Sequence, residues 1–283
     1  MRTFAIASVL IAVVSAGVQV ERALARQAPP AAPQAQAGGN QAAPSLPVDE
    51  IIRKFAAREK EFKLARDNYT YRQTVKVQDL TDGGGVRGEY RIDADIIFTP
   101  SHKRIERVTY APQSTLRSFS ISPEDDRDLR DIQPFVLTSD DIDKYNIRYL
   151  GRQRVDEVDT YVFSVSPKTI EKGQRYFEGQ IWVDDRDLQI VKSYGKAVPD
   201  IRGKRGEGEN LFPRFETYRE QIDGKYWFPT YTRAEDTLHF SSGPVRMRMI
   251  VTYKDYKYFG AESTIKYEGV TDQPEQKAPP KKP

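Results

Sequence analysis

Few residues in this chain of 283 are of the types that enzymes use at reacting centres. The two histidines, His102 and His239, lie far apart and form neither an H-x-x-H nor an H-E-x-x-H zinc motif. There is no cysteine to act as a nucleophile or a metal ligand, and no G-x-S-x-G motif. The sequence therefore predicts no catalytic residue, no metal site and no cofactor, and it indicates that the protein is not an enzyme.

Carboxylates cluster in one place, between Glu124 and Asp131. The cluster lacks the alternating D-x-D-x-D-G pattern of a calcium loop. Ser122 and Asp125 instead have the spacing of a capping box, with Pro123 at the first helical position. Acidic residues also favour a helix N-terminus because of the helix dipole. We therefore expect a short helix over residues 122–133 rather than a calcium site.

Aromatic side chains are the best candidates for binding without chemistry, since the chain has 16 tyrosines, 13 phenylalanines and 2 tryptophans. Most of these rings are expected to fill an ordinary core. Several alternate with polar residues in predicted strands, so a second interpretation is that some line a cavity for a hydrophobic ligand. The candidates for such a cavity are Phe55, Tyr176, Trp182, Tyr218, Trp227 and Tyr231.

Period-2 alternation positions these side chains on strands. Phe177, Ile181 and Val183 alternate with polar or bulky neighbours, which is typical of a strand with one buried face. An amphipathic helix is predicted over residues 48–66, and a second short helical turn over 139–143. The predicted strands are 68–79, 86–99, 103–110, 145–155, 159–167, 174–184, 187–196, 214–222, 225–237 and 244–259. So many amphipathic strands predict a mainly β protein built on one large antiparallel sheet, with the helix packed on it.

The two ends of the chain have compositions unlike the middle. Residues 1–25 read as a signal peptide, with an apolar run from Phe4 to Val14 and a small-x-small pattern at Ala23 to Ala25. An uncleaved anchor helix is the alternative for this segment. Residues 26–47 form an Ala/Pro-rich linker and residues 271–283 a Pro/Lys-rich tail. An exported, periplasmic protein is therefore expected.

Charge and cysteine content narrow the class of protein further. The formal net charge is only +3, which argues against nucleic acid as a partner. With no cysteine there is no disulfide, so stability has to come from a packed core. One domain over residues 48–270, expected to be monomeric, is long enough to bury such a core.

Several segments together resemble the outer-membrane lipoprotein-sorting proteins of the LolA/LolB-like superfamily. The resemblance is carried by an N-Y-x-Y strand, a Y-L-G turn region, a G-Q-I-W-V-D strand and a D-G-K-Y-W-F-P hairpin, beginning at Asn68, Tyr149, Gly179 and Asp223 respectively. It implies a strongly curved antiparallel sheet, an unclosed barrel, whose open side is covered by the N-terminal helix and short helices. It also implies an apolar cavity that holds lipid or lipoprotein acyl chains.

Two functions of different classes follow from these observations. The first is a periplasmic carrier or binder of a hydrophobic ligand, with no covalent chemistry. The alternative is an envelope-stress or structural interaction module of the same fold, which binds a protein partner or a membrane. The sequence lacks the lipidated cysteine of the receptor branch of the superfamily, so a soluble carrier and a sensor both remain open.

Overall fold

The computed structural model describes residues 44–99, 101, 103–123, 125, 129, 135–200 and 211–259. The predicted signal peptide, nearly all of the linker, the tail and His102 lie outside these residues. The elements are α1 (Val48–Arg66), β1 (Tyr69–Leu80), β2 (Val86–Phe98), β3 (Arg104–Tyr110), a 3₁₀ turn η1 (Ile142–Lys144), β4 (Tyr145–Val155), β5 (Val158–Pro167), β6 (Tyr176–Asp184), β7 (Ile190–Val198), β8 (Phe215–Ile222), β9 (Tyr226–Phe240) and β10 (Gly243–Tyr258). The predicted helix and all ten predicted strands are thus confirmed, with ends that differ by a few residues.

The strands form one ten-stranded antiparallel sheet in the order β3-β2-β1-β10-β9-β8-β7-β6-β5-β4. The edge strands β3 and β4 do not pair with each other, so the sheet is not closed into a barrel. Register shifts interrupt several of the pairings, including β4 with β5 and β6 with β7. Such bulges increase the local twist and bend of a sheet. The unclosed antiparallel architecture expected from the sequence is confirmed.

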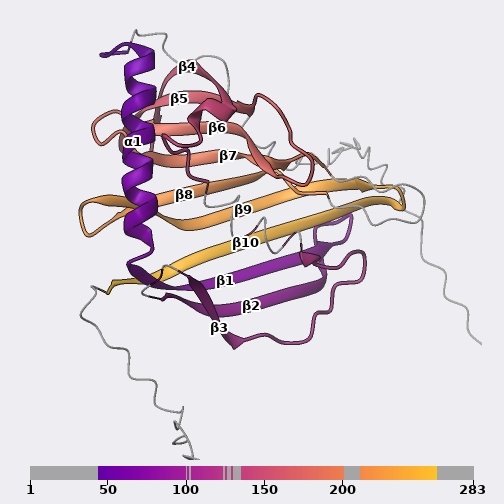
Figure 1. The fold of residues 1–283 in the computed structure, drawn as a ribbon. Coiled ribbons are helices and arrows are strands. Elements are labelled where there is room, and N and C mark those ends of the chain that lie inside the picture. The colour runs from indigo at the N-terminus through magenta and orange to yellow at the C-terminus, as the bar shows by residue number, and fades with distance from the viewer. Residues whose placement is uncertain are drawn as a thin grey trace, which may run out of the picture. The chain divides into compact units, whose positions relative to one another are not determined.

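Helix α1 crosses one face of the sheet, which we call the inner face (Figure 1). Its apolar positions Ile51, Phe55 and Phe62 are fully buried, at the spacing that a single helix stripe requires. Acidic residues occupy the first turn and basic residues the last, the arrangement that the helix dipole favours. The helix is therefore held mainly by its contact with the inner face.

The opposite, outer face of the sheet is charged. Arg248 on β10 donates to Glu235 on β9 at 2.9 Å, and Arg107 on β3 donates to Asp95 on β2 at 2.7 Å. Opposite charges on neighbouring strands stabilise a sheet modestly and keep its face in water. The period-2 pattern of the sequence thus corresponds to one covered and one largely wet face.

The predicted turns and cap form as expected. Asp223 and Gly224 have φ values of 53° and 67°, the left-handed pair that a two-residue hairpin turn requires. Ser122 and Asp125 bond reciprocally, each side chain accepting the other's backbone N–H. Pro123, Asp125 and Leu129 are helical, while the rest of residues 122–133 lies largely outside the described part. The predicted turn at 139–143 becomes η1, shifted toward β4.

Two glycines pair directly across strands on the inner face. Gly179 on β6 lies opposite Gly195 on β7, and the ring of Phe177 covers both. A Cβ added at Gly195 would lie 2.3 Å from the carbonyl oxygen of Glu178 and 2.7 Å from the Phe177 ring. A backbone atom cannot move aside cheaply, so position 195 excludes any side chain.

We expect Gly195→Ala to lower the free energy of unfolding by about 1–3 kcal/mol, the range for overpacking a filled core. Urea unfolding measures the loss. Gly83→Ala is the matched control, because a Cβ at Gly83 would meet one atom only at 4.0 Å. Equal stability of the two variants would contradict this packing of Phe177 on the glycine pair.

Candidate functional site

Under α1 the inner face is a filled aromatic core. Phe55 is fully buried, with its ring centroid 5.5 Å from that of Phe163 on β5. The rings of Phe135 and Phe177 stack at 4.2 Å nearby. Tyr176 belongs to the same cluster, 6.3 Å from Tyr145. Phe55 and Tyr176 therefore act as packing residues in this structure, and a ligand contact by either stays a prediction.

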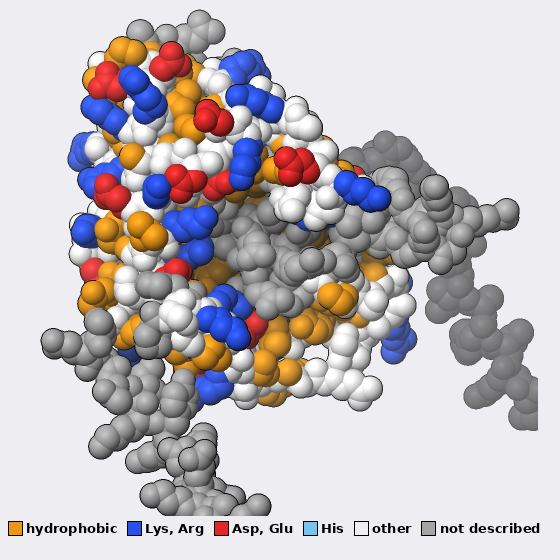
Figure 2. Space-filling view, in the orientation of Figure 1, with side chains coloured by type: hydrophobic (Ala, Val, Ile, Leu, Met, Phe, Trp, Pro, Cys, Tyr) orange, Lys and Arg blue, Asp and Glu red, His pale blue; other side chains and the backbone are white. Residues whose placement is uncertain are grey.

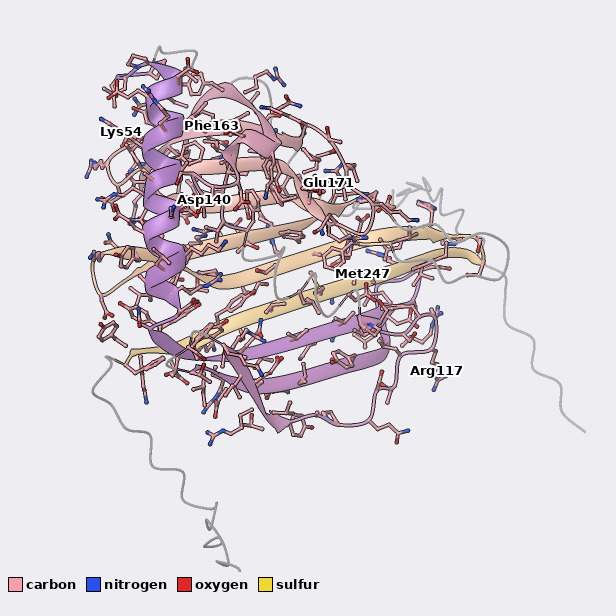
Figure 3. The ribbon with its side chains drawn as sticks, in the orientation of Figure 1. Lys54, Arg117, Asp140, Phe163, Glu171 and Met247 are labelled. Carbon is pink, nitrogen blue, oxygen red and sulfur yellow. The ribbon has the colours of Figure 1, made fainter. Side chains whose placement is uncertain are left out.

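Beyond α1 the inner face is largely apolar along β9, β10, β1 and β2, with two carboxylates on it, Asp79 and Asp236, directly opposite Met247 on the neighbouring strands. Met247 and Met249 on β10 project from it, and Figure 3 shows Met247 well away from the helix. Figure 2 shows hydrophobic side chains at the surface over β10, β1 and β2. The further apolar residues of this region are Val75, Val77, Tyr90, Ile92, Phe119, Ala234, Leu238 and Phe240. We call this set, with the two methionines, the apolar wall.

A row of polar side chains crosses the inner face next to the apolar wall. The hydroxyls of Thr217 and Thr232 lie 2.9 Å apart, and both residues are buried. Arg104 on β3 donates to the amide oxygen of Gln73 on β1 at 3.1 Å. Between these pairs lies Tyr253, whose hydroxyl is buried near Thr232 and Gln73 and whose pKa is raised by burial. Such a row can hold the polar end of an otherwise apolar ligand.

A buried ion pair joins α1 to the sheet. Both carboxylate oxygens of Glu59 lie 3.1 Å from Nη1 of Arg219 on β8. The backbone N–H of Ile190 donates to Glu59 Oε1 at 3.0 Å, and Arg219 also donates to the carbonyl oxygen of Phe135. Burial raises the pKa of the Glu59 carboxyl, whereas Arg219 and the Ile190 N–H act in the opposite direction. This pair fixes where α1 sits on the inner face.

Four of the six predicted cavity residues lie on the outer face. Trp182 packs with its cross-strand neighbour Val162, which is adjacent in sequence to the inner-face Phe163. Because successive strand residues point to opposite faces, Trp182 faces away from α1. Trp227 belongs to the same outer cluster, and Tyr218 pairs directly with Tyr231.

The outer aromatic residues have polar partners of their own. The ammonium of Lys192 lies 4.7 Å from the Trp182 ring centroid and 5.0 Å from that of Tyr218. The indole N–H of Trp182 donates to Gln153 at 2.8 Å, and that of Trp227 to Asp187 at 3.2 Å. Burial, together with the nearby Glu216 carboxylate, raises the pKa of Tyr218 to about 12.

The six predicted residues therefore do not line one cavity between helix and sheet. Phe55 and Tyr176 are on the inner face, and Trp182, Tyr218, Trp227 and Tyr231 are on the outer face. The period-2 alternation of apolar and polar residues separates the two faces of each strand. It does not say which face the helix covers, because both faces carry aromatic rings. Only the position of α1 separates them.

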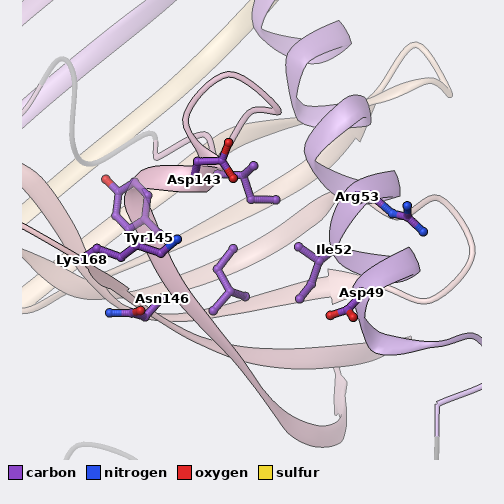
Figure 4. Close-up of a pocket in the computed structure, with 9 residues that line it drawn as sticks. Asp49, Ile52, Arg53, Asp143, Tyr145, Asn146 and Lys168 are labelled. Atoms are coloured by element: carbon purple, nitrogen blue, oxygen red, sulfur yellow. The ribbon is translucent and has the colours of Figure 1, made fainter.

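A pocket of about 550 Å³ opens between the first half of α1 and edge strand β4 (Figure 4). Its apolar floor is made by Ile52, Ile142 and Ile147. Tyr145, Asn146 and four charged residues, Asp49, Arg53, Asp143 and Lys168, complete the lining. The size is in the usual range for ligand pockets.

No group of three or more His, Asp or Glu side chains that could hold a metal ion occurs among the described residues. His239 is exposed on β9, and Asp184 in the β6–β7 turn accepts backbone N–H groups of Arg186 and Asp187. Within the same ranges, no helix is long and apolar enough to cross a membrane.

Comparison with known proteins gives fold neighbours. No protein-family model and no curated protein matches the sequence. Similar solved structures include a DUF1329 family protein from Desulfovibrio piger, 17% identical, covering 77% of this chain and 95% of that one, with a TM-score of 0.41. A LolA superfamily protein from Nitrosomonas europaea is 13% identical, covering 72% and 94%, with a TM-score of 0.33. A domain described as an outer membrane lipoprotein-sorting protein, from Vibrio parahaemolyticus, is 12% identical, covering 78% and 95%, with a TM-score of 0.34.

The last two structures come from the lipoprotein-sorting group that the sequence resembles. At these identities and TM-scores, the likeness assigns no ligand to this chain.

Sequence reasoning missed Glu59, the polar row and the pocket. One signal for Glu59 was present, because it lies four residues after Phe55 and three before Phe62 and so falls within the apolar helix stripe. A charged residue in such a stripe indicates a buried partner. The polar row and the pocket had no such signal, since each joins residues from distant segments.

Proposed function

We propose that this protein binds and carries a hydrophobic ligand, such as a lipid or a lipoprotein acyl chain, without covalent chemistry. The ligand lies along the apolar wall on the inner face of β9, β10, β1 and β2. The observation that carries the proposal is that the apolar inner face extends past α1, where no part of that helix covers it (Figure 1).

The chemistry of the wall suits an acyl chain. Met247 and Met249 are two of only three methionines in the chain, and both lie on this face, 3% and 2% exposed. Methionine is flexible and polarisable, so it adapts to ligands of different shape. Each methylene group that moves from water to such a surface contributes about 0.8 kcal/mol. Tyr90, Ile92 and Phe119 are only partly buried, so they have apolar area left to cover.

The polar row gives the ligand an orientation. An acyl chain on Met247 and Met249 would place its polar end toward Thr232 and Tyr253, farther along the inner faces of β9 and β10. The buried Tyr253 hydroxyl would donate a hydrogen bond to that polar end. We therefore favour a lipid with a polar group at one end over a pure hydrocarbon.

The place of action we propose is the periplasm. It rests on the signal-like composition of residues 1–25 and on the Ala/Pro-rich linker that follows. A domain over residues 48–270 would then act outside the cytoplasm as a monomer, joined to its N-terminal segment by the linker.

A fatty acid that carries a photoactivatable diazirine tests the ligand site. After illumination and proteolysis, we expect labelled peptides from β1, β9 and β10. Met247→Gln is expected to weaken binding roughly tenfold, because an amide against hydrocarbon costs about 1–3 kcal/mol and 1.4 kcal/mol is a factor of ten.

Ile250→Gln is the matched control, since Ile250 is on the same strand but pairs with Arg233 on the outer face. Its binding should equal that of the parent protein. Labelling of outer-face peptides alone, or an unchanged affinity in Met247→Gln, would contradict the proposed site.

A second function, binding of a protein partner, is favoured by the pocket between α1 and β4. The pocket is separate from the apolar wall, so a carrier and an interaction module are compatible in one chain.

A further inference from the structure

The pocket between α1 and β4 lies at an open edge of the sheet. Among the described strands, β4 pairs with β5 alone and is the last strand of the order. The pocket is lined by three consecutive β4 residues, Tyr145, Asn146 and Ile147. Because consecutive strand residues point to opposite faces, a pocket that touches all three lies against the edge of the strand. The edge presents backbone groups that no neighbouring strand occupies.

Four charged side chains around this edge have no ion-pair partner among the described residues. Asp49, Arg53, Asp143 and Lys168 line the pocket, and no ion pair joins any of them to another residue in the described ranges. Elsewhere on the domain, charged side chains pair closely, as Lys54 does with Glu50 at 2.9 Å and Lys144 with Asp141 at 2.7 Å. Two unpaired charges of each sign therefore surround an apolar floor.

We propose that this groove binds an extended peptide segment of a partner protein, which adds a strand to the free edge of β4. One bulky apolar side chain of the peptide enters the pocket onto Ile52, Ile142 and Ile147. Residues of opposite charge on either side of it pair with the carboxylates and with the cations of the rim. In strand addition of this kind, main-chain hydrogen bonds provide the affinity, and pockets for alternate side chains of the peptide provide the specificity.

Charge complementarity favours a peptide over other occupants. A second copy of this chain would pair β4 with β4, and the symmetric register about Ile147 would place Asn146 opposite Arg148 and Tyr145 opposite Tyr149. The added strand would then bring arginines and no carboxylate to the cations of the rim. A purely apolar ligand would also bury charged groups without partners, which is costly. A peptide can supply both signs of charge and the missing backbone hydrogen bonds.

A library of random linear peptides displayed on phage tests the proposal on the whole domain. We expect enriched sequences with a bulky apolar residue flanked by residues of opposite charge. The double variant Arg53→Glu, Lys168→Glu should bind the strongest enriched peptide at least tenfold more weakly. A peptide with its acidic residues changed to lysine should recover binding to that variant.

Lys54→Glu is the control for Arg53→Glu, because it makes the same single charge reversal one residue along α1 and Lys54 does not line the pocket. It should bind the peptide as the parent protein does. Methylating backbone nitrogens of the peptide at one set of alternate positions should abolish binding, while methylating the other set should not, since only alternate N–H groups face a partner strand.

The proposal is overturned if no displayed peptide binds the parent protein better than it binds the double variant. It is also overturned if methylating either set of alternate backbone nitrogens weakens binding equally. It is also overturned if the domain dimerises through β4, measured by light scattering, and the double variant stays dimeric. Fatty-acid binding should be unchanged in every variant used here, because none of the substituted residues belongs to the apolar wall. Failure of this proposal and failure of the carrier proposal are therefore distinguishable.

Discussion

Glu59→Ala is expected to lower the free energy of unfolding by about 3–5 kcal/mol, the largest effect that a charged residue of this domain should show. The substitution leaves the Arg219 guanidinium buried over the Phe62 ring, with the carbonyl oxygen of Phe135 as its one remaining hydrogen-bond partner in the described part of the chain. It also removes the acceptor of the Ile190 N–H. Chemical denaturation followed by circular dichroism measures the loss.

Glu61→Ala is the matched control on the same helix, because Glu61 is exposed and pairs only with Arg58 at the surface. A change of less than about 0.5 kcal/mol is expected there.

Replacing both partners of the buried pair separates two explanations for such a loss. Glu59→Met with Arg219→Met should be much less destabilising than Glu59→Ala, because no unpaired charge is then left inside. If the double variant is as unstable as the single one, the pair contributes through packing and not through charge.

Phe55→Ala is expected to cost about 3–5 kcal/mol, as removal of a fully buried ring does in other cores. Phe55 is 0% exposed and packs on Phe163 beneath α1. Its loss would leave a cavity between helix and sheet. Urea unfolding measures the effect.

Leu64→Ala on the same helix serves as the control, since Leu64 is 65% exposed and should change stability little. A loss below roughly 1 kcal/mol in Phe55→Ala would show that α1 does not pack on the core.

The elements of the fold follow from the sequence because they depend on local spacing. The helix stripe of Ile51, Phe55 and Phe62 and the period-2 strands each reflect which side chains share a face. The Asp223-Gly224 turn and the Ser122 cap depend on the backbone preferences of two to four adjacent residues. None of these features needs a distant partner.

The candidate site could not be read in the same way. Trp182 and Phe177 have the same kind of strand environment in the sequence, yet one packs outside and the other under α1. Which face α1 covers depends on contacts between residues far apart in the chain, such as Phe55 with Phe163 and Glu59 with Arg219. Residue type alone therefore points to aromatic side chains on both faces, and four of the six candidates lie on the outer face.

The sequence by itself determined the composition of the domain: a helix, ten amphipathic strands and no catalytic or metal-binding motif. Only the tertiary structure decided which face is covered, which carries the apolar wall, and where α1 and edge strand β4 form a pocket. The physical reason is that periodicity records the difference between two faces of a strand, whereas a site requires side chains from strands distant in sequence to meet. That meeting is fixed by strand order, by bulges in the register and by one buried ion pair.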